Sequence, residues 1–129
     1  MIKTKSIHDQ PERSDGQRIL VSLYWPKAAD PKIVDLWLPE LGSELELIKN
    51  WGTRKFDWNY FKLEYLKKIQ QPELKSLIKD LAETAKEKNI TLIGHARRSQ
   101  DCQRTLLKEY IDNNYIFKTE SLENKQTTL

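Results

Sequence analysis

Two short apolar stretches of the chain have the pattern of buried strands. Residues 18–25 read RILVSLYW, a run rich in β-forming residues that is bounded by Gly16 and Pro26. Residues 90–94 read ITLIG and follow a long stretch of helical pattern. Residues 2–7 alternate apolar and polar positions, which predicts a third, short strand at the edge of a sheet.

Between these strands the apolar residues recur at helical spacing. Asp30 and Pro31 suit the N-cap and first position of a helix, which predicts a short helix over residues 31–38. The sequence SELE at residues 43–46 has the spacing of a capping box, so a second helix is predicted to begin there and to end at Gly52.

Two longer amphipathic patterns follow. Residues 56–70 carry a single stripe of large apolar residues, Trp58, Phe61, Tyr65, Leu66 and Ile69. Pro72 begins the next predicted helix, whose apolar face consists of Leu74, Leu77, Ile78, Leu81, Ala82 and Ala85.

A last helix is predicted after residues 90–94. Ser99 is a suitable N-cap for it, and its narrow apolar stripe consists of Leu106, Leu107, Tyr110 and Ile111. Residues 113–129 are mostly polar and are predicted to form a C-terminal tail. We therefore expect residues 1–112 to form a single domain, which fits a chain of 129 residues.

The alternation of strands and helices indicates the fold class. A helical connection returns the chain in the direction in which it left the sheet, so strands separated by helices pair in parallel. The sequence therefore predicts an α/β domain with a small, mainly parallel sheet, flanked by helices in a three-layer arrangement.

Composition places the chain among globular proteins and narrows its setting. Hydrophobic residues make up 38% and charged residues 32% of the chain, with a mildly basic net charge of +3. The single cysteine, Cys102, cannot form an internal disulfide, and no run approaches the roughly 20 apolar residues that cross a bilayer. We expect a cytoplasmic protein that does not associate with membranes; its oligomeric state does not follow from the sequence.

The most informative stretch is LIGHARRSQDCQRTLLKEY, residues 92–110. In open α/β sheets, ligands bind beyond the carboxyl ends of the strands. If the strands over 18–25 and 90–94 are parallel, Trp25 and Lys27 leave the sheet at the same edge as His95 and the basic residues after it.

An anion site is predicted at this edge. The N-terminus of the helix after Ser99 offers unpaired N–H groups and the positive end of a dipole. Arg97 and Arg98 are placed to clamp a phosphate or carboxylate through paired hydrogen bonds. The predicted ligand-binding residues are Trp25, Lys27, His95, Arg97, Arg98, Ser99 and Arg104. The expected partner is a phosphate-bearing small molecule or nucleic acid; the alternative is that these arginines only solvate a loop.

A catalytic alternative uses the same edge. A cysteine in the first turn of a helix, beside arginines, has the setting of a reactive thiolate, and His95 is a candidate general base. A small hydrolase or group-transfer enzyme using His95 or Cys102 is therefore the second hypothesis, although a half-buried structural Cys102 explains the same position. His8 is assigned no role.

Other site classes find no support in the sequence. There is no Walker loop, no G-x-G-x-x-G motif, no nucleophile elbow and no zinc-ligand spacing, so we predict neither a metal nor a cofactor. The aromatic residues of 25–65 are predicted to build the core, with base stacking or an oligomer interface as alternatives.

The order of these features resembles one family. The stretches LYWPK, DLWLPELGSELELIKNW, WNYFKLEYLKKI and TLIGHARRSQDCQRTLLKEYI, spread over residues 2–112, resemble the YeaO-like branch of the domain-of-unknown-function 488 family. The resemblance implies a compact α/β domain.

The chain also departs from the pattern of that family. There the first strand ends in an acidic residue and an arginine ahead of a Trp-Pro-Arg-Gly turn, whereas this chain has Ser22 and Leu23 and continues with Trp25-Pro26-Lys27-Ala28. The family also commonly has an acidic residue after the basic residue that follows the second strand, and histidines at the start of the last helix. At these places this chain has Arg98, Asp101 and Gln103. These exchanges favour the binding of an anion over proton transfer.

Overall fold

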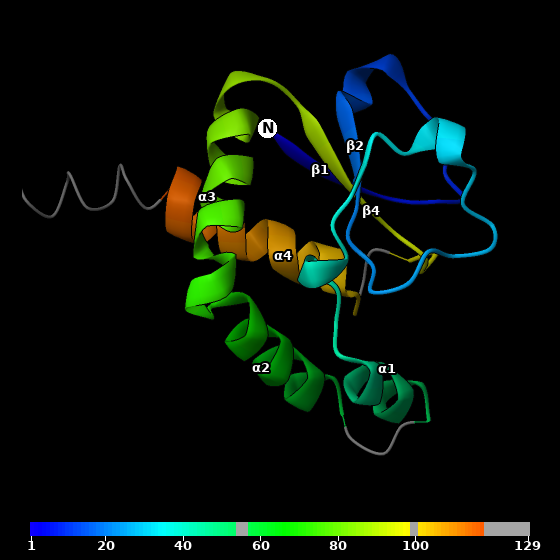
Figure 1. Cartoon of the computed structure of the whole chain (residues 1–129), viewed down its shortest axis with the longest axis vertical. Coiled ribbons are helices and arrows are strands. Elements are labelled where there is room, and N and C mark those ends of the chain that lie inside the picture. Colours follow the sequence, from blue (N-terminus) through cyan, green and yellow to red (C-terminus); the bar gives the residue numbers. More distant parts are fainter. Residues whose placement is uncertain (54–56, 99–100, 118–129) are drawn as a thin grey trace, which may run out of the picture.

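The computed structural model describes residues 1–53, 57–98 and 101–117 of the chain. In this part of the chain four strands form one parallel sheet in the order β1-β4-β2-β3 (Figure 1). The strands are β1 (Ile2–Ser6), β2 (Gln17–Leu20), β3 (Leu36–Trp37) and β4 (Ile90–Gly94). The α/β class and the parallel pairing of the two apolar strands are confirmed.

β4 is the centre of the sheet although it is the last strand in the sequence. It pairs in parallel with β1 on one side and with β2 on the other, and all five of its residues are buried. Ser6 of β1 lies opposite Gly94, and Leu20 of β2 lies opposite Ile93. The chain therefore leaves β1, β2 and β4 at the same edge of the sheet.

Four α-helices in the described residues pack beside this sheet (Figure 1). They are α1 (Leu45–Gly52), α2 (Trp58–Ile69), α3 (Pro72–Glu87) and α4 (Gln103–Ile111), and a π-helical turn, Asp112–Ile116, continues α4. α4 packs against β1 and β4, and α2 packs against α4. No helix in this part of the chain combines the length and apolar character that crossing a membrane would require.

The main core lies between the helices and one face of the sheet. Because side chains alternate across a strand, every second strand residue faces the helices; these residues are Ile2, Ile19, Val21, Ile90 and Leu92. The helical stripes predicted from the sequence meet them, with Phe61, Tyr65 and Ile69 buried from α2 and Leu106, Leu107 and Ile111 buried from α4. Trp51 of α1 and Trp58, Phe61 and Tyr65 of α2 join this core, whereas Tyr60 is exposed. The rings of Trp58 and Phe61 stack with their centroids 4.9 Å apart.

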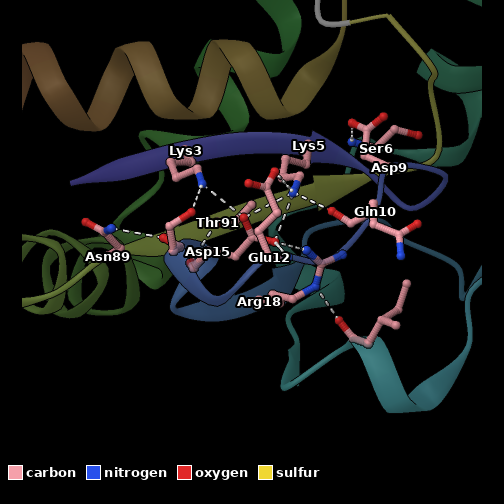
Figure 2. A network of polar contacts seen from close by, with 12 residues as sticks. Lys3, Lys5, Ser6, Asp9, Gln10, Glu12, Asp15, Arg18, Asn89 and Thr91 are labelled. Carbon is pink, nitrogen blue, oxygen red and sulfur yellow. Dashed lines mark hydrogen bonds and ion pairs between the residues drawn. The ribbon is translucent and has the colours of Figure 1, made fainter.

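The other face of the sheet carries a polar network around Asp15, on the side away from α4 (Figure 2). The Asp15 carboxylate is fully buried and accepts hydrogen bonds from Lys3 Nζ at 3.0 Å, from Lys5 Nζ at 3.1 Å and from Arg18 Nη1. Its own backbone carbonyl accepts a hydrogen bond from Thr91 Oγ1 at 2.7 Å. One acidic side chain thus ties the turn after β1 to the three neighbouring strands.

The surroundings of Asp15 favour its charged form. Burial alone would raise the pKa of this carboxyl, but hydrogen bonds from the Glu12 N–H, Lys3 and Lys5 hold it well below its usual range. A buried carboxylate with several cationic partners is stable as a group, and removing it leaves those cations uncompensated.

The predicted helix over residues 31–38 is wrong. Asp30 does cap a turn, since its side chain accepts the Lys32 N–H at 2.9 Å, but the turn ends at Ile33 as a 3-10 helix, Pro31–Ile33. Leu36 and Trp37 instead pair in parallel with Ile19 and Leu20 as β3. A short helix is marginal by itself, so pairing with the sheet prevails.

β2 is shorter than predicted, because it ends at Leu20 rather than at Trp25. Val21 still donates a hydrogen bond to the Ile93 carbonyl at 3.1 Å, and the chain then turns away from the sheet. Gly42 packs against this departing segment so closely that a Cβ at position 42 would lie 2.2 Å from Leu23 N. The absence of a side chain at Gly42 thus allows the two loops to touch.

Two predicted helix starts also lie elsewhere. α1 begins at Leu45 with Glu44 at its N-cap, and Ser43 makes no capping hydrogen bond; its N–H and its hydroxyl both bind Gln103. α4 begins at Gln103 with Cys102 at its N-cap, later than predicted. Ser99 and residues 118–129 of the predicted tail lie outside the described residues.

Replacing Asp15 with asparagine should lower the free energy of unfolding by about 3 kcal/mol at pH 7, because three cationic partners lose their counter-charge. Since the pKa of Asp15 is lower in the folded state, its stabilising contribution is complete above the pKa of the unfolded chain and is lost as the pH falls below about 4. Urea unfolding followed by circular dichroism between pH 7 and pH 3 measures both effects.

Asp80, which is exposed on α3, offers the matched control. Asp80→Asn should change the unfolding free energy by less than about 0.5 kcal/mol. An Asp15→Asn variant as stable as Asp80→Asn, at every pH, would show that the network does not stabilise the fold.

Candidate functional site

A cavity of about 610 Å³ lies at the carboxyl edge of the sheet. Its walls come from the segment after β2, from the segment after β4, from the start of α4, and from α1 and α2. This is the place at which the parallel pairing of β2 and β4 brings two loops and a helix N-terminus together.

Arg104 is the unusual residue of this cavity. Its side chain lines the cavity although the residue is only 3% exposed. Nη2 donates a hydrogen bond to the Arg98 carbonyl at 2.9 Å, while Nε is buried and has no hydrogen-bond partner among the described residues. Within the described residues no carboxylate forms an ion pair with Arg104. A buried cation without a counter-charge is costly, and a bound anion would remove that cost.

Gly94 makes room for this guanidinium at the end of β4. A Cβ at position 94 would lie 3.1 Å from Arg104 Nη1 and 3.4 Å from Arg104 Cδ. Because Gly94 has no side chain, the Arg104 side chain can approach the backbone of β4 closely. The side chain thereby lies directly over the carboxyl end of the central strand.

Gln103 holds the walls of the cavity together. Its Oε1 accepts hydrogen bonds from Ser43 N at 2.9 Å and from Ser43 Oγ at 2.6 Å. Its Nε2 donates to the carbonyls of Val21 and of Leu41, the latter at 3.3 Å. One amide at the start of α4 therefore fixes the end of β2 and the loop before α1.

The loop before α1 has two further clamps from α2. The buried hydroxyl of Tyr65 donates to the Leu41 carbonyl at 2.7 Å, and Lys68 Nζ donates to the Gly42 carbonyl. Burial raises the pKa of the Tyr65 hydroxyl well above its usual range, so the group remains a donor throughout the pH range in which the protein is folded. These two hydrogen bonds hold in place the loop from which Ser43 lines the cavity.

The structure brings only some of the predicted ligand-binding residues to the cavity. Lys27, His95 and Arg104 line it. Trp25 does not belong to its walls: its Nε1 donates to the Ala29 carbonyl at 3.0 Å, and its ring packs edge-on against Trp37. Arg97 and Arg98 are exposed and are not among the described residues that line the cavity.

Cys102 also lines the cavity, at the N-cap of α4. The residue is buried, and its Sγ lies 3.2 Å from Thr105 Oγ1. His95, at the start of the same segment between β4 and α4, lines the cavity too. The hydrolase or group-transfer hypothesis for these two residues stays a prediction.

His8 lies at the same edge of the sheet, although no motif or spacing in the sequence points to it. Its ring and that of His95 approach edge-on with centroids 5.5 Å apart. Local loss of hydration, followed by the positive charges of Arg97 and His95, lowers the pKa of His8. The position of His8 beside His95 follows from the strand register. Ser6 and Gly94 lie opposite each other at the ends of β1 and β4, and His8 and His95 follow them in the two loops that leave this edge.

No group of three or more histidine, cysteine, aspartate or glutamate side chains in the described ranges is arranged to hold a metal ion. The described lining of the cavity combines the buried Arg104 and the start of α4 with the side chains of Lys27, His95, Asp101 and Cys102.

Comparisons with known proteins identify similar sequences. Residues 2–115 match a family model described as the active DUF488-N3 subclade. The chain is also 30% identical, over 112 residues, to a protein of Escherichia coli (strain K12) described as "Uncharacterized protein YeaO". This match covers 85% of the present chain and 96% of the E. coli protein. No solved structure matches the chain significantly.

Arg104→Met should leave the fold intact and raise the free energy of unfolding by about 1 kcal/mol, because it replaces a buried charge without a counter-charge by an apolar side chain of similar length. Thermal and urea unfolding in a buffer free of phosphate and sulfate measure this difference. A loss of several kcal/mol would mean that Arg104 is primarily a structural residue and that the cavity is not arranged for an anion.

Proposed function

The chain belongs to the DUF488 family, in its N3 subclade, and on that premise we propose that it binds a small phosphate-bearing ligand in the cavity at the carboxyl ends of β2 and β4. The ligand's phosphate lies at the start of α4 and the rest of the ligand fills the cavity.

The single observation that carries the proposal is the state of Arg104. Arg104 lines the cavity and is buried, no carboxylate of the described residues pairs with it, and its Nε–H has no hydrogen-bond partner among them. Charged hydrogen bonds from a guanidinium to a phosphate are among the strongest that proteins form. Burying the Arg104 charge without a counter-charge costs free energy, and an anion that binds to it recovers part of that free energy.

The start of α4 adds a second attraction for the same group. The first N–H groups of a helix have no acceptor within the helix, and its dipole places partial positive charge at this end. Gln103 and Arg104 are the first two residues of α4, which is nine residues long, and both line the cavity. The helix end and the guanidinium therefore attract an anion to the same place.

A small ligand fits this site better than nucleic acid. Arg104 is too deeply buried to reach the backbone of a nucleic acid, whose binding depends on exposed cations that contact successive phosphates. Of the exposed cations of this edge, Lys27 lines the cavity, whereas Arg97 and Arg98 do not.

Isothermal titration calorimetry with inorganic phosphate at low ionic strength tests the proposal. The wild-type protein should bind phosphate, and Arg104→Met should weaken binding by at least about tenfold, since a charged hydrogen bond contributes about 1.5–3 kcal/mol. Arg98→Met is the matched control, because Arg98 contacts Arg104 only through its backbone carbonyl. It should change the affinity by less than about twofold.

Two outcomes would contradict the proposal. One is equal phosphate binding by wild type and Arg104→Met. The other is binding of a single-stranded 12-nucleotide DNA that is tighter than that of phosphate and is lost in the double variant Arg97→Ala, Arg98→Ala. The second result would place recognition on the exposed arginines and identify nucleic acid as the partner.

A further inference from the structure

We infer that the ligand carries a flat, apolar, aromatic body beside its phosphate, as in an aryl phosphate. This inference rests on the proposed function and concerns the part of the cavity that a phosphate ion does not fill. A cavity of about 610 Å³ lies in the size range of sites for organic molecules and is far larger than a bound ion requires.

Two polar side chains that line the cavity, Ser43 and Gln103, are already engaged. Ser43 uses both its N–H and its hydroxyl on Gln103 Oε1, and the Gln103 amide donates to two backbone carbonyls. These groups hold the walls in place and have little remaining capacity to bind hydroxyl groups of a ligand. A sugar or glycerol body would give up hydrogen bonds to water wherever it lies against the apolar side chains of the cavity.

The opposite wall is apolar and aromatic. Ile48, Trp51 and Phe61 line it from α1 and α2. The rings of Trp51 and Phe61 are tilted at 52° with their centroids 6.1 Å apart, and Trp58 stacks behind Phe61. Such a wall offers ring faces and edges to another ring. Leu23 and Pro26 continue the apolar surface on the side of β2.

The groups able to bind an anion lie on the other side of the cavity, at the start of α4 and the end of β4. The cavity thus offers one place for an anionic group, at Arg104, and a separate place for an apolar group, beside Trp51. A molecule with a single phosphate and an aromatic ring matches both, whereas inorganic phosphate matches only the first.

A series of ligands tests the inference without changing the protein. Calorimetry should show that phenyl phosphate binds at least about tenfold more tightly than inorganic phosphate, because its ring is removed from water. Glycerol 3-phosphate should bind no more than about twofold more tightly than inorganic phosphate. Equal affinities for phenyl phosphate and glycerol 3-phosphate would overturn the inference and leave the proposed function standing, whereas failure of all three to bind would overturn both.

A pair of variants tests where the ring lies. Trp51→Leu keeps an apolar side chain but removes the ring, and should weaken phenyl phosphate binding about fivefold while leaving inorganic phosphate binding unchanged. Tyr60→Leu is the matched control, since Tyr60 is exposed on α2 and is not one of the described residues that line this cavity. Equal affinities of these two variants for phenyl phosphate would overturn the assignment of the ring to the aromatic wall.

Discussion

The parallel pairing of β4 with both β1 and β2 is the constraint on which the rest of the structure depends. Because three strands run in the same sense, their carboxyl ends meet at one edge, and the loops that carry His8, Lys27 and His95 start from there. The first residues of α4 line the cavity at that edge. The cavity is thus a consequence of strand direction, and its chemistry is set by the few residues that follow each strand.

The two faces of the sheet differ in whether their buried charges have a counter-charge. On the face away from α4, Asp15 is surrounded by Lys3, Lys5 and Arg18, so its charge is compensated and the network stabilises the fold. On the helical face, Arg104 is as deeply buried, but no carboxylate in the described residues pairs with it. Arg18 and Arg104 each keep one buried nitrogen without a hydrogen-bond partner in the described residues, so the difference lies in the counter-charge. Compensated charge indicates a structural role, and uncompensated charge lining a cavity indicates a place for a ligand. This contrast distinguishes the candidate site from the other polar clusters of the described chain.

The sequence predicts α2 and α3 because their helical periodicity extends over many residues, and β4 because it is a short apolar run after a helical pattern. The fold class follows from the alternation of such elements along the chain. The sequence fails at β3, where two residues pair with Ile19 and Leu20, because no local pattern reports a partner elsewhere in the chain. The sequence does not predict the hydrogen bonds of Gln103 for the same reason, because its partners lie 60 and 82 residues away along the chain. Arg104 was selected only as one of several cations. Its spacing to Leu107 and Ile111, three and seven residues on, places it on the buried face of α4 and was a signal that it differs from the exposed Arg97 and Arg98.

The central claim is that the buried guanidinium of Arg104 receives an anion, and the Nε–H of that side chain is the most direct probe of it. In ¹H–¹⁵N spectra of the protein, its signal is identified by its absence from the Arg104→Met variant. On titration with phosphate, the account predicts a saturable downfield shift of this proton as the guanidinium gains a charged acceptor. A signal that stays in place at saturating phosphate, while those of the exposed arginines move, would contradict the account.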